Sequence, residues 1–341
     1  MLLNISLDPR WHTAMPAYEH TISLITEILS ALALYLMLTK TPRSGKSFSK
    51  YLMILQASIM MVDLNFGYIV SPIALYPVPG GLCNGIICTW FGFTGHAGIS
   101  LIISSVALVA ISIIYCFHFK YVMIGQMSGR DSLTARRHKF FRLAVFLLHA
   151  IPCVMHIGLY RNLEGGPRIV KKLFPSMYYL IENPSYRAFV YDMSLYTDYI
   201  MYFCAVALVI SILAVSSVVW FVTTSCSMIT KQARNAIRTT ISGKTFQSFL
   251  CEKTKQLQHR LMTILVVQTV IPLGVQFMPT LIHSYSILTL SLNPNINNAL
   301  LCFQLTHPLI HTTVLILSTP SYQEAMKFWQ EKKRRGSTPQ L

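Results

Sequence analysis

The sequence predicts an all-α membrane protein, folded as one bundle of seven transmembrane helices. Three observations support this fold class: 53% of the 341 residues are hydrophobic, the apolar residues gather into seven long stretches, and most basic residues lie between those stretches. Because about 20 apolar residues in a helix cross the hydrocarbon core of a bilayer, each stretch is long enough to span it. The expected spans are residues 17–39, 51–75, 93–117, 140–160, 199–223, 261–285 and 297–318, and none contains a lysine.

The basic residues predict the orientation of these spans. The connections after the first, third and fifth spans, together with the tail, hold most of the 28 lysines and arginines. Only six lie on the other side: Arg10, Arg161, Arg168, Lys171, Lys172 and Arg187. Because positive segments are retained in the cytoplasm, we expect the N-terminus outside and the C-terminus inside. The net charge of +16 therefore indicates topology and contact with anionic lipid rather than binding of nucleic acid.

The spans divide the chain into three parts. Residues 1–16 form an extracellular N-terminus, residues 17–318 the bundle, and residues 319–341 a cytoplasmic tail. The first residues lack a basic segment followed by an apolar core, so the first span is expected to act as an uncleaved anchor. Asn4 begins an N-glycosylation triplet in the outside segment. In the tail, Thr319 and Pro320 begin a short amphipathic helix that is expected to rest on the membrane surface.

The eight cysteines are interpreted mainly as small packing residues. Seven lie in or at the ends of spans or in a cytoplasmic loop: Cys88, Cys116, Cys153, Cys204, Cys226, Cys251 and Cys302. Only Cys83 lies clearly outside. The long external connection, residues 161–198, has no cysteine, so the usual loop-to-helix disulfide of seven-helix receptors is not expected.

Ionisable residues inside the spans predict a polar layer at one depth of the bundle. A charge near the bilayer centre costs at least about 2.5 kcal/mol unless it is paired or hydrated. Residues at this depth are Glu27, Asp63, Ser104, Ser105, His149 and His307. We expect Asp63 to contact His307 or a serine hydroxyl, directly or through water. The layer could be a switch or a purely structural network.

Two prolines predict bent helices near a ligand pocket. Pro272 and Pro308 each remove a backbone donor inside an expected span. Toward the outside, the neighbouring spans offer apolar walls and a few polar anchors. The residues expected to bind a ligand there are Trp90, His96, Tyr199, Tyr202, Gln276, Phe277, His283 and Gln304, with Met278, Tyr285, Asn298 and Cys302 in the same region.

Other functions fit the residues less well. The seventh span has no lysine for a retinal Schiff base, and no local pattern suggests a nucleophilic serine. His307 and His311 stand four residues apart on one helical face, where they could share zinc in an intramembrane hydrolase. Such enzymes also use a histidine from an early span, and here the second span has none. No catalytic residue, cofactor or metal is expected. A ligand-gated seven-helix channel, with its N-terminus inside, is the other alternative.

Motifs along all seven spans resemble one receptor family. They include Tyr35-Leu36 with Lys40-Thr41-Pro42, Tyr51-Leu52, Leu55-Gln56 and Asp63, Ser71-Pro72, Leu75-Tyr76-Pro77, residues 80–85, Cys116-Phe117 with Lys120, His307-Pro308, and Thr319-Pro320-Ser321-Tyr322. The segment 40–85 is the most diagnostic. In these motifs the chain resembles the nematode serpentine chemoreceptors of the Str superfamily, closest to class I, with class H as the near alternative.

The resemblance implies a G-protein-coupled receptor in the plasma membrane, in the cilia of sensory neurons, that detects environmental chemicals. Its partners would be a small-molecule ligand, a heterotrimeric G protein and membrane lipid. The G protein would face the loops that contain Arg136, Arg137, Arg234 and Arg238. The chain departs from rhodopsin-like receptors, because the third span ends without an acidic-arginine pair and the sixth has no tryptophan beside Pro272. We therefore do not expect the activation mechanism of rhodopsin-like receptors to apply to this chain.

Overall fold

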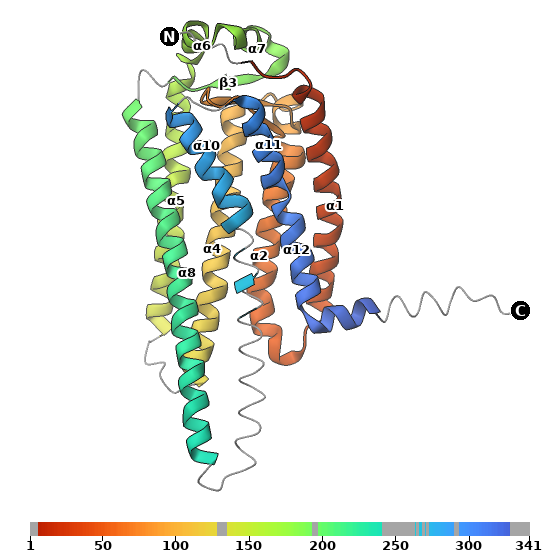
Figure 1. Cartoon of the computed structure of the whole chain (residues 1–341), viewed down its shortest axis with the longest axis vertical. Coiled ribbons are helices and arrows are strands. Elements are labelled where there is room, and N and C mark those ends of the chain that lie inside the picture. The colour runs from red at the N-terminus through yellow and green to blue at the C-terminus, as the bar shows by residue number, and fades with distance from the viewer. Residues whose placement is uncertain are drawn as a thin grey trace, which may run out of the picture.

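The computed structural model describes residues 6–127, 135–192, 197–240, 273–289 and 293–327, with the single positions 263, 266, 267 and 270. Its long helices run side by side as one bundle (Figure 1). They are α1 (Trp11–Lys40), α2 (Lys46–Leu64), α4 (Gly95–Met127), α5 (Ala135–Gly158), α8 (Thr197–Thr240), α10 (Met278–Thr289), α11 (Pro294–Leu305) and α12 (His307–Ser318). Below, the end that carries the N-terminus is called the sheet end, and the opposite end the tail end.

Six of the seven expected spans appear as apolar helices, although α4 and α8 extend well beyond the predicted boundaries at the tail end. In the described part of the chain, six helices are long and apolar enough to cross a membrane, with α11 and α12 counted as one. The sixth expected span, residues 261–285, is described only in part, as the π-helical turn η6 (Leu273–Phe277) followed by α10. Pro272 lies outside the described residues.

The second span ends earlier than expected. The helix α2 continues through the π-helical turn η2 (Asn65–Ile69) and then stops, so the predicted boundary at residue 75 is wrong. Ser71 has a positive φ of 45°, and Pro72 has no amide to donate to a helix. The Ser71 hydroxyl donates a hydrogen bond to the buried Glu19 carboxylate on α1. The apolar residues 72–75 therefore leave the helix and enter a small sheet.

The seventh span is interrupted in its middle. The first half, α11, ends at Leu305, and α12 begins at His307. Pro308 lacks the amide that would otherwise donate to the carbonyl of Gln304, so the helical hydrogen bonding breaks there. This is the bend that Pro308 predicted.

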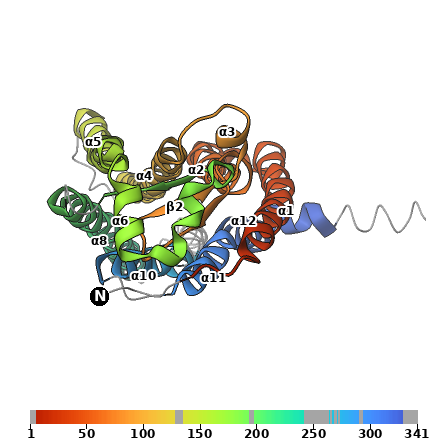
Figure 2. The ribbon, with the colours of Figure 1, turned by 90° about the horizontal axis from the view of Figure 1, so that it is seen from above.

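An antiparallel three-stranded sheet covers the sheet end of the bundle. Its strands β1 (Pro72–Ala74), β2 (Gly80–Cys83) and β3 (Ala188–Val190) pair in that order. Ile73 pairs with Leu82, and Gly81 with Phe189. Short helices lie with the sheet: α3 (Ile86–Thr89), η3 (Leu159–Leu163), α6 (Gly166–Leu173), η4 (Pro175–Met177), α7 (Tyr179–Glu182) and η5 (Pro184–Tyr186). Figure 2 shows β2 and α6 lying over the opening between the long helices. The sequence patterns did not predict these strands.

A disulfide joins Cys83 at the end of β2 to Cys88 in α3, with their Cα atoms 6.0 Å apart. Cys88 was expected in or at the end of a span as a packing residue. That interpretation is wrong, because α4 begins only at Gly95 and residues 84–94 form a separate loop. The long external connection takes no part in this bond, as its lack of cysteine required.

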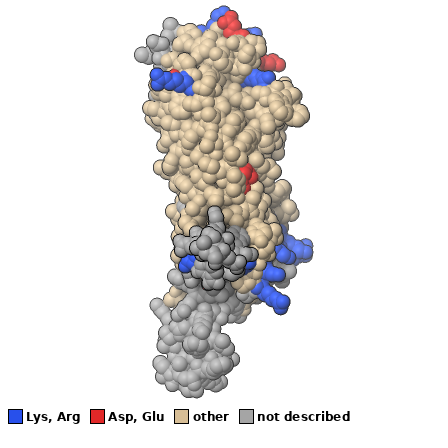
Figure 3. Space-filling view, turned by 90° about the vertical axis from the view of Figure 1, so that its right-hand side faces the viewer, with Lys and Arg blue, Asp and Glu red and all other residues tan. Residues whose placement is uncertain are grey.

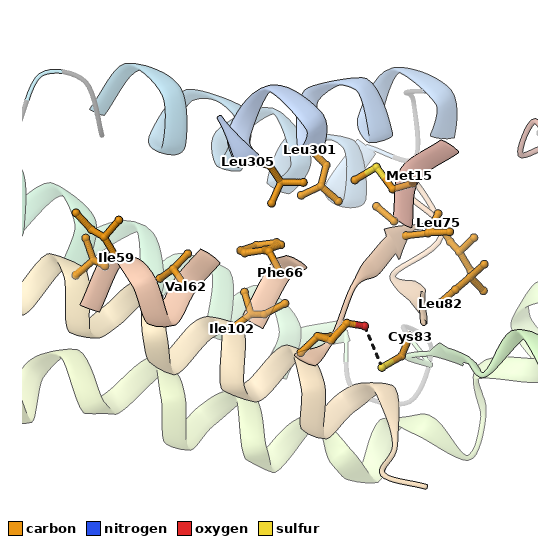
Figure 4. Close-up of a cluster of buried hydrophobic side chains, with 14 of the residues drawn as sticks. Met15, Ile59, Val62, Phe66, Leu75, Leu82, Cys83, Ile102, Leu301 and Leu305 are labelled. Carbon is orange, nitrogen blue, oxygen red and sulfur yellow. Dashed lines mark hydrogen bonds between the residues drawn. The ribbon is translucent and has the colours of Figure 1, made fainter. Parts of the chain in front are cut away.

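A hydrophobic core joins the sheet to the helices. Figure 4 shows Met15, Phe66, Leu75, Leu82, Leu301 and Leu305 among its members. On one side of it, α1 and η2 are in very close contact, because a Cβ added to Gly67 would overlap the Ser23 side chain. Only glycine permits this approach of the two backbones.

The sheet is attached to α11 by one side-chain amide. Asn298 Nδ2 donates to the carbonyl oxygen of Ala74 at 2.9 Å, and the Ala74 amide donates to Asn298 Oδ1 at 3.0 Å. Ala74 lies on β1, which is the edge of the sheet, so the amide takes the place of a neighbouring strand. Both residues are buried. Each of these backbone groups would otherwise be left without a partner.

We therefore expect Asn298→Ala to destabilise the protein by about 1–3 kcal/mol, the cost of leaving buried backbone groups unpaired. The unfolding temperature of the purified protein in lipid nanodiscs should fall. Ile296→Ala, on the exposed side of the same helix, is the matched control and should leave it nearly unchanged. Equal unfolding temperatures for the two variants would show that the amide does not hold the sheet.

Candidate functional site

A pair of carboxyl groups lies between α1 and α2. Asp63 is fully buried, and its carboxyl group lies close enough to that of Glu27 for the two to interact. The Ser23 hydroxyl is 3.2 Å from Asp63 Oδ1 and 3.3 Å from the Asp63 carbonyl oxygen. Two negative charges at this separation in an apolar bundle repel each other, so the arrangement favours a pair with at most one charge. The structure thus brings Glu27 and Asp63 together, two residues that the sequence places at one depth.

The serine beside Asp63 is not one of those expected. Ser104 and Ser105 donate to carbonyl oxygens of their own helix, those of Ser100 and Ile102, each at 2.8 Å. In an apolar bundle these carbonyls are the nearest acceptors for a helical serine. The prediction that Ser104 and Ser105 belong to the layer with Asp63 is therefore wrong. Ser23, on α1, takes that place.

The histidines expected in the layer lie apart from this pair. The ring of His149 bonds to the carbonyl oxygen of Val145 within α5. His307 and His311 are buried on α12 with ring centroids 6.0 Å apart. Within the described residues, His307 Nε2 and both ring nitrogens of His311 have no hydrogen-bond partner. The described part of the chain also contains no group of three or more histidine, cysteine or acidic residues that could hold a metal ion.

A small cavity, about the size of one water molecule, connects Asp63 to the helices that follow the fifth span. Two of the expected ligand-binding residues reach the same cavity. Its lining residues are Val62, Asp63, Phe66, Gln276, Gln304, Leu305 and Pro308. The cavity thus lies at the break between α11 and α12, where the helical hydrogen bonding is interrupted.

Between this cavity and the sheet, polar side chains join α10 to α11. Gln304 Nε2 donates to Thr280 Oγ1 at 3.1 Å, and His283 Nε2 is 3.2 Å from the carbonyl oxygen of Asn297. The His283 ring also packs against Tyr76, 5.3 Å between centroids. Burial raises the pKa of Tyr76 to about 12, so its hydroxyl keeps its proton.

A second polar cluster lies on the other side of the sheet end, where β3 meets α4 and α5. The Tyr191 hydroxyl is 2.9 Å from His96 Nδ1 and 3.3 Å from His156 Nε2, and the two imidazole rings stack. Ser100 Oγ lies 2.9 Å from His156 Nδ1. Burial raises the pKa of Tyr191, so the phenol remains a donor. Of these residues, only His96 was predicted to bind a ligand. His156 lies near the end of the neighbouring span at the same depth, and this position could have identified it as well.

The other expected ligand-binding residues do not share one pocket. The Tyr199 hydroxyl donates to the carbonyl oxygen of Met155 at 2.9 Å and packs beside the second cluster. Trp90 and Tyr202 are 81% and 66% exposed, so the prediction that they line the pocket that opens to the outside is wrong. Both side chains lie on the outer surface of the molecule. The side chain of Phe277 lies outside the described residues.

The tail end carries the residues expected to face a cytosolic partner. Arg136 and Arg137 are exposed at the start of α5. Arg234 and Arg238 lie on the last turns of α8, and their side chains are outside the described part. Asn4 is outside it as well. On the face shown in Figure 3, lysines and arginines gather near the two ends and leave a broad band between them, as expected of a surface inside a bilayer.

Residues 320–327 form the helix expected after the last span. Its apolar residues Tyr322 and Ala325 are buried against α1 and α12, and the Tyr322 and Thr41 hydroxyls are 3.1 Å apart. The inner part of its apolar face thus packs on the bundle rather than on the membrane surface.

Comparison with known proteins assigns the family. The family model of the serpentine type 7TM GPCR chemoreceptor Srh matches residues 13–330. The chain belongs to the Srh family. The serpentine superfamily expected from the sequence is thereby supported, while the preference for class I over class H is not confirmed. A multi-pass membrane receptor of GPCR type is the function class of this family.

Among solved structures, that of squid rhodopsin is similar to this Srh chain, with a TM-score of 0.66 at 12% identity. The likeness covers 96% of this chain and 90% of squid rhodopsin. At this identity the comparison shows the fold, a seven-transmembrane helix bundle, and nothing of ligand or partner. A search of the curated proteins finds no match.

Proposed function

We propose that this chain is a G-protein-coupled chemoreceptor that senses a small environmental molecule and activates a heterotrimeric G protein. The match of the Srh model to residues 13–330 carries this proposal. The basic residues support an orientation with the sheet end outside, because 21 of the 28 lysines and arginines follow the odd-numbered spans or lie in the tail, and Arg142 lies just inside the fourth span on the same side. The receptor would reside in the plasma membrane of sensory cilia, with Asn4 available for glycosylation.

The ligand would act where the sheet meets α10 and α11. Here Gln304, Thr280 and His283 form a partly buried polar interface, and Gln304 also lines the cavity that Asp63 lines. A ligand shifts a conformational equilibrium only by the difference between its affinities for the two states. A small polar molecule that replaces the bond between Gln304 and Thr280 would favour a different packing of these helices.

The carboxyl pair would transmit this change to the tail end. Glu27 and Asp63 would hold one proton between them, and Asp63 lines the cavity together with Gln276 and Pro308. A shift of α10 or of the α11–α12 break alters that cavity, and with it the partners available to the carboxyl group. The switch proposed here therefore consists of Glu27, Asp63 and Ser23. His307 precedes the lining residue Pro308 and is not included, and neither are Ser104 and Ser105, whose hydroxyls bond within α4.

We expect Gln304→Leu to raise the ligand concentration for half-maximal response by roughly tenfold or more, equivalent to about 1.4 kcal/mol. The measurement is calcium imaging of cells expressing the receptor, challenged with a panel of odorants. Phe303→Ala, whose side chain faces outward on the same helix, is the matched control. Equal shifts in both variants, at equal surface expression, would place the ligand elsewhere.

Asp63→Asn keeps the size of the side chain but removes the group that exchanges a proton with Glu27. We expect the maximal response to change, with surface expression close to that of the unmodified receptor. Ser58→Ala, on the same helix, removes a hydroxyl bonded to Ser112 rather than to the pair and should behave normally. An unchanged dose-response curve for Asp63→Asn would end the switch proposal.

Reversing charge at Arg136 and Arg137 to glutamate should weaken coupling severalfold, because the exposed cations would attract an acidic partner surface. The same reversal at Arg234 and Arg238 should add to the loss. The readout is G-protein activation at matched surface expression. Arg168→Glu, exposed at the sheet end, is the control and should leave coupling intact. Loss of expression in parallel with coupling would indicate misfolding instead.

A further inference from the structure

Residues 84–95, called the aromatic loop, present large apolar side chains to the exterior. Trp90, Phe91 and Phe93 are 81%, 69% and 55% exposed. The loop contains no charged residue. Three neighbouring aromatic side chains exposed together at the surface of a folded protein need a partner, because solvent contact with so much apolar area is unfavourable.

The aromatic loop is fixed firmly at its base. The Gly85 amide donates to the carbonyl oxygen of Val70 at 2.8 Å, and the Asn84 amide to that of Ser71 at 3.2 Å. A Cβ on Gly85 would overlap the Ile69 carbonyl, so the backbones are in direct contact. The disulfide from Cys88 to Cys83 adds a covalent link to β2. The exposed aromatic rings are therefore held in place rather than left on a free chain.

Several backbone amides of the loop are paired within it. The amides of Cys88 and Thr89 donate to the Gly85 carbonyl, and those of Trp90 and Phe93 to the carbonyls of Ile86 and Ile87. The Thr89 carbonyl accepts from the Arg187 guanidinium at 3.2 Å. Such internal pairing is what a segment needs in order to leave bulk water, since lipid offers few hydrogen bonds.

The surroundings point to lipid as the partner. In Figure 2, α3 lies at the outer rim of the bundle, beside the ends of α2 and α4, and away from the sheet over the centre. The exposed apolar residues Ile54 and Met61 on α2, and Leu101 and Leu108 on α4, form the lipid-facing surface that begins below it. Tryptophan concentrates at the boundary between hydrocarbon and headgroups, and Arg187 stands beside the loop, where it can meet a phosphate.

We propose that the aromatic loop inserts into the headgroup boundary of the leaflet at the sheet end and anchors the sheet to the bilayer. The partner is the lipid itself, reached by Trp90, Phe91 and Phe93. Because Cys88 is bonded to Cys83 of β2, a force on the loop reaches the sheet directly. The sheet is then held from two sides, by lipid through the loop and by Asn298 through α11. This proposal does not depend on the identity of the ligand or of the G protein.

The test measures the depth of Trp90 by fluorescence quenching. The full chain is placed in phosphatidylcholine nanodiscs whose acyl chains carry bromine near the glycerol or near the terminal methyl. Trp11, Trp220 and Trp329 are replaced by phenylalanine, so that Trp90 alone emits. A second version lacks all four native tryptophans and carries Ile212→Trp, at an exposed position near the middle of the membrane-spanning part of α8, as the deep reference. The difference in emission between the unmodified chain and Trp90→Phe gives the same quantity without the triple replacement.

We expect bromine near the glycerol to quench Trp90 more than bromine near the methyl, and aqueous iodide to quench it weakly. The tryptophan at position 212 should respond more than Trp90 to the deep bromine. Strong quenching by iodide with no bromine effect would overturn the proposal, because the loop would then lie in water. Protection from both quenchers only when each nanodisc holds two copies would overturn it too, in favour of a second copy of the chain as the partner.

Discussion

Inside a bundle that lipid surrounds, a buried polar group without a partner costs several kcal/mol, since no bulk water can replace the missing bond. This constraint explains most of the polar architecture of the chain. At the sheet end, the amide of Asn298 completes the open edge of β1. Deeper in the bundle, Gln56 Nε2 bonds to the hydroxyls of Ser30 and Thr312 at 2.9 Å each and so joins α1, α2 and α12. Between α1 and α2, the Asp63 carboxyl group accepts a hydrogen bond from the Ser23 hydroxyl.

Sequence patterns predicted what depends on the length and polarity of whole segments, and failed where single residues redirect the chain. The spans, the helix after the last span and the meeting of Glu27 with Asp63 follow from hydropathy and depth. The strand β1 was missed because Ile73, Ala74 and Leu75 continue an apolar run without interruption, and only the conformation at Ser71 ends the helix. Cys88 was misplaced for the same reason. Depth along a span also says nothing about which way a side chain points, which is why Ser104, Ser105, Trp90 and Tyr202 were assigned to the interior.

The similarity to squid rhodopsin at 12% identity shows how little of the fold rests on particular residues. Apolar helices of bilayer length, joined by short connections, leave few ways to pack, so the arrangement persists while the contacts between helices change. The functional details are local to this chain. The buried pair between α1 and α2, the histidines bridged by Tyr191, and the break at Pro308 are held by residues that a fold comparison does not test.

The close contact at Gly67 limits how this receptor can change shape. Because no atom separates the Gly67 backbone from the Ser23 side chain, α1 cannot slide along the end of α2 without a steric clash. These two helices therefore form a rigid pair. Since α12 packs on this pair and Gln56 of α2 bonds to Ser30 and Thr312, rearrangement of the bundle is left to the segments that meet at the break before His307, which can pivot there against a fixed reference frame.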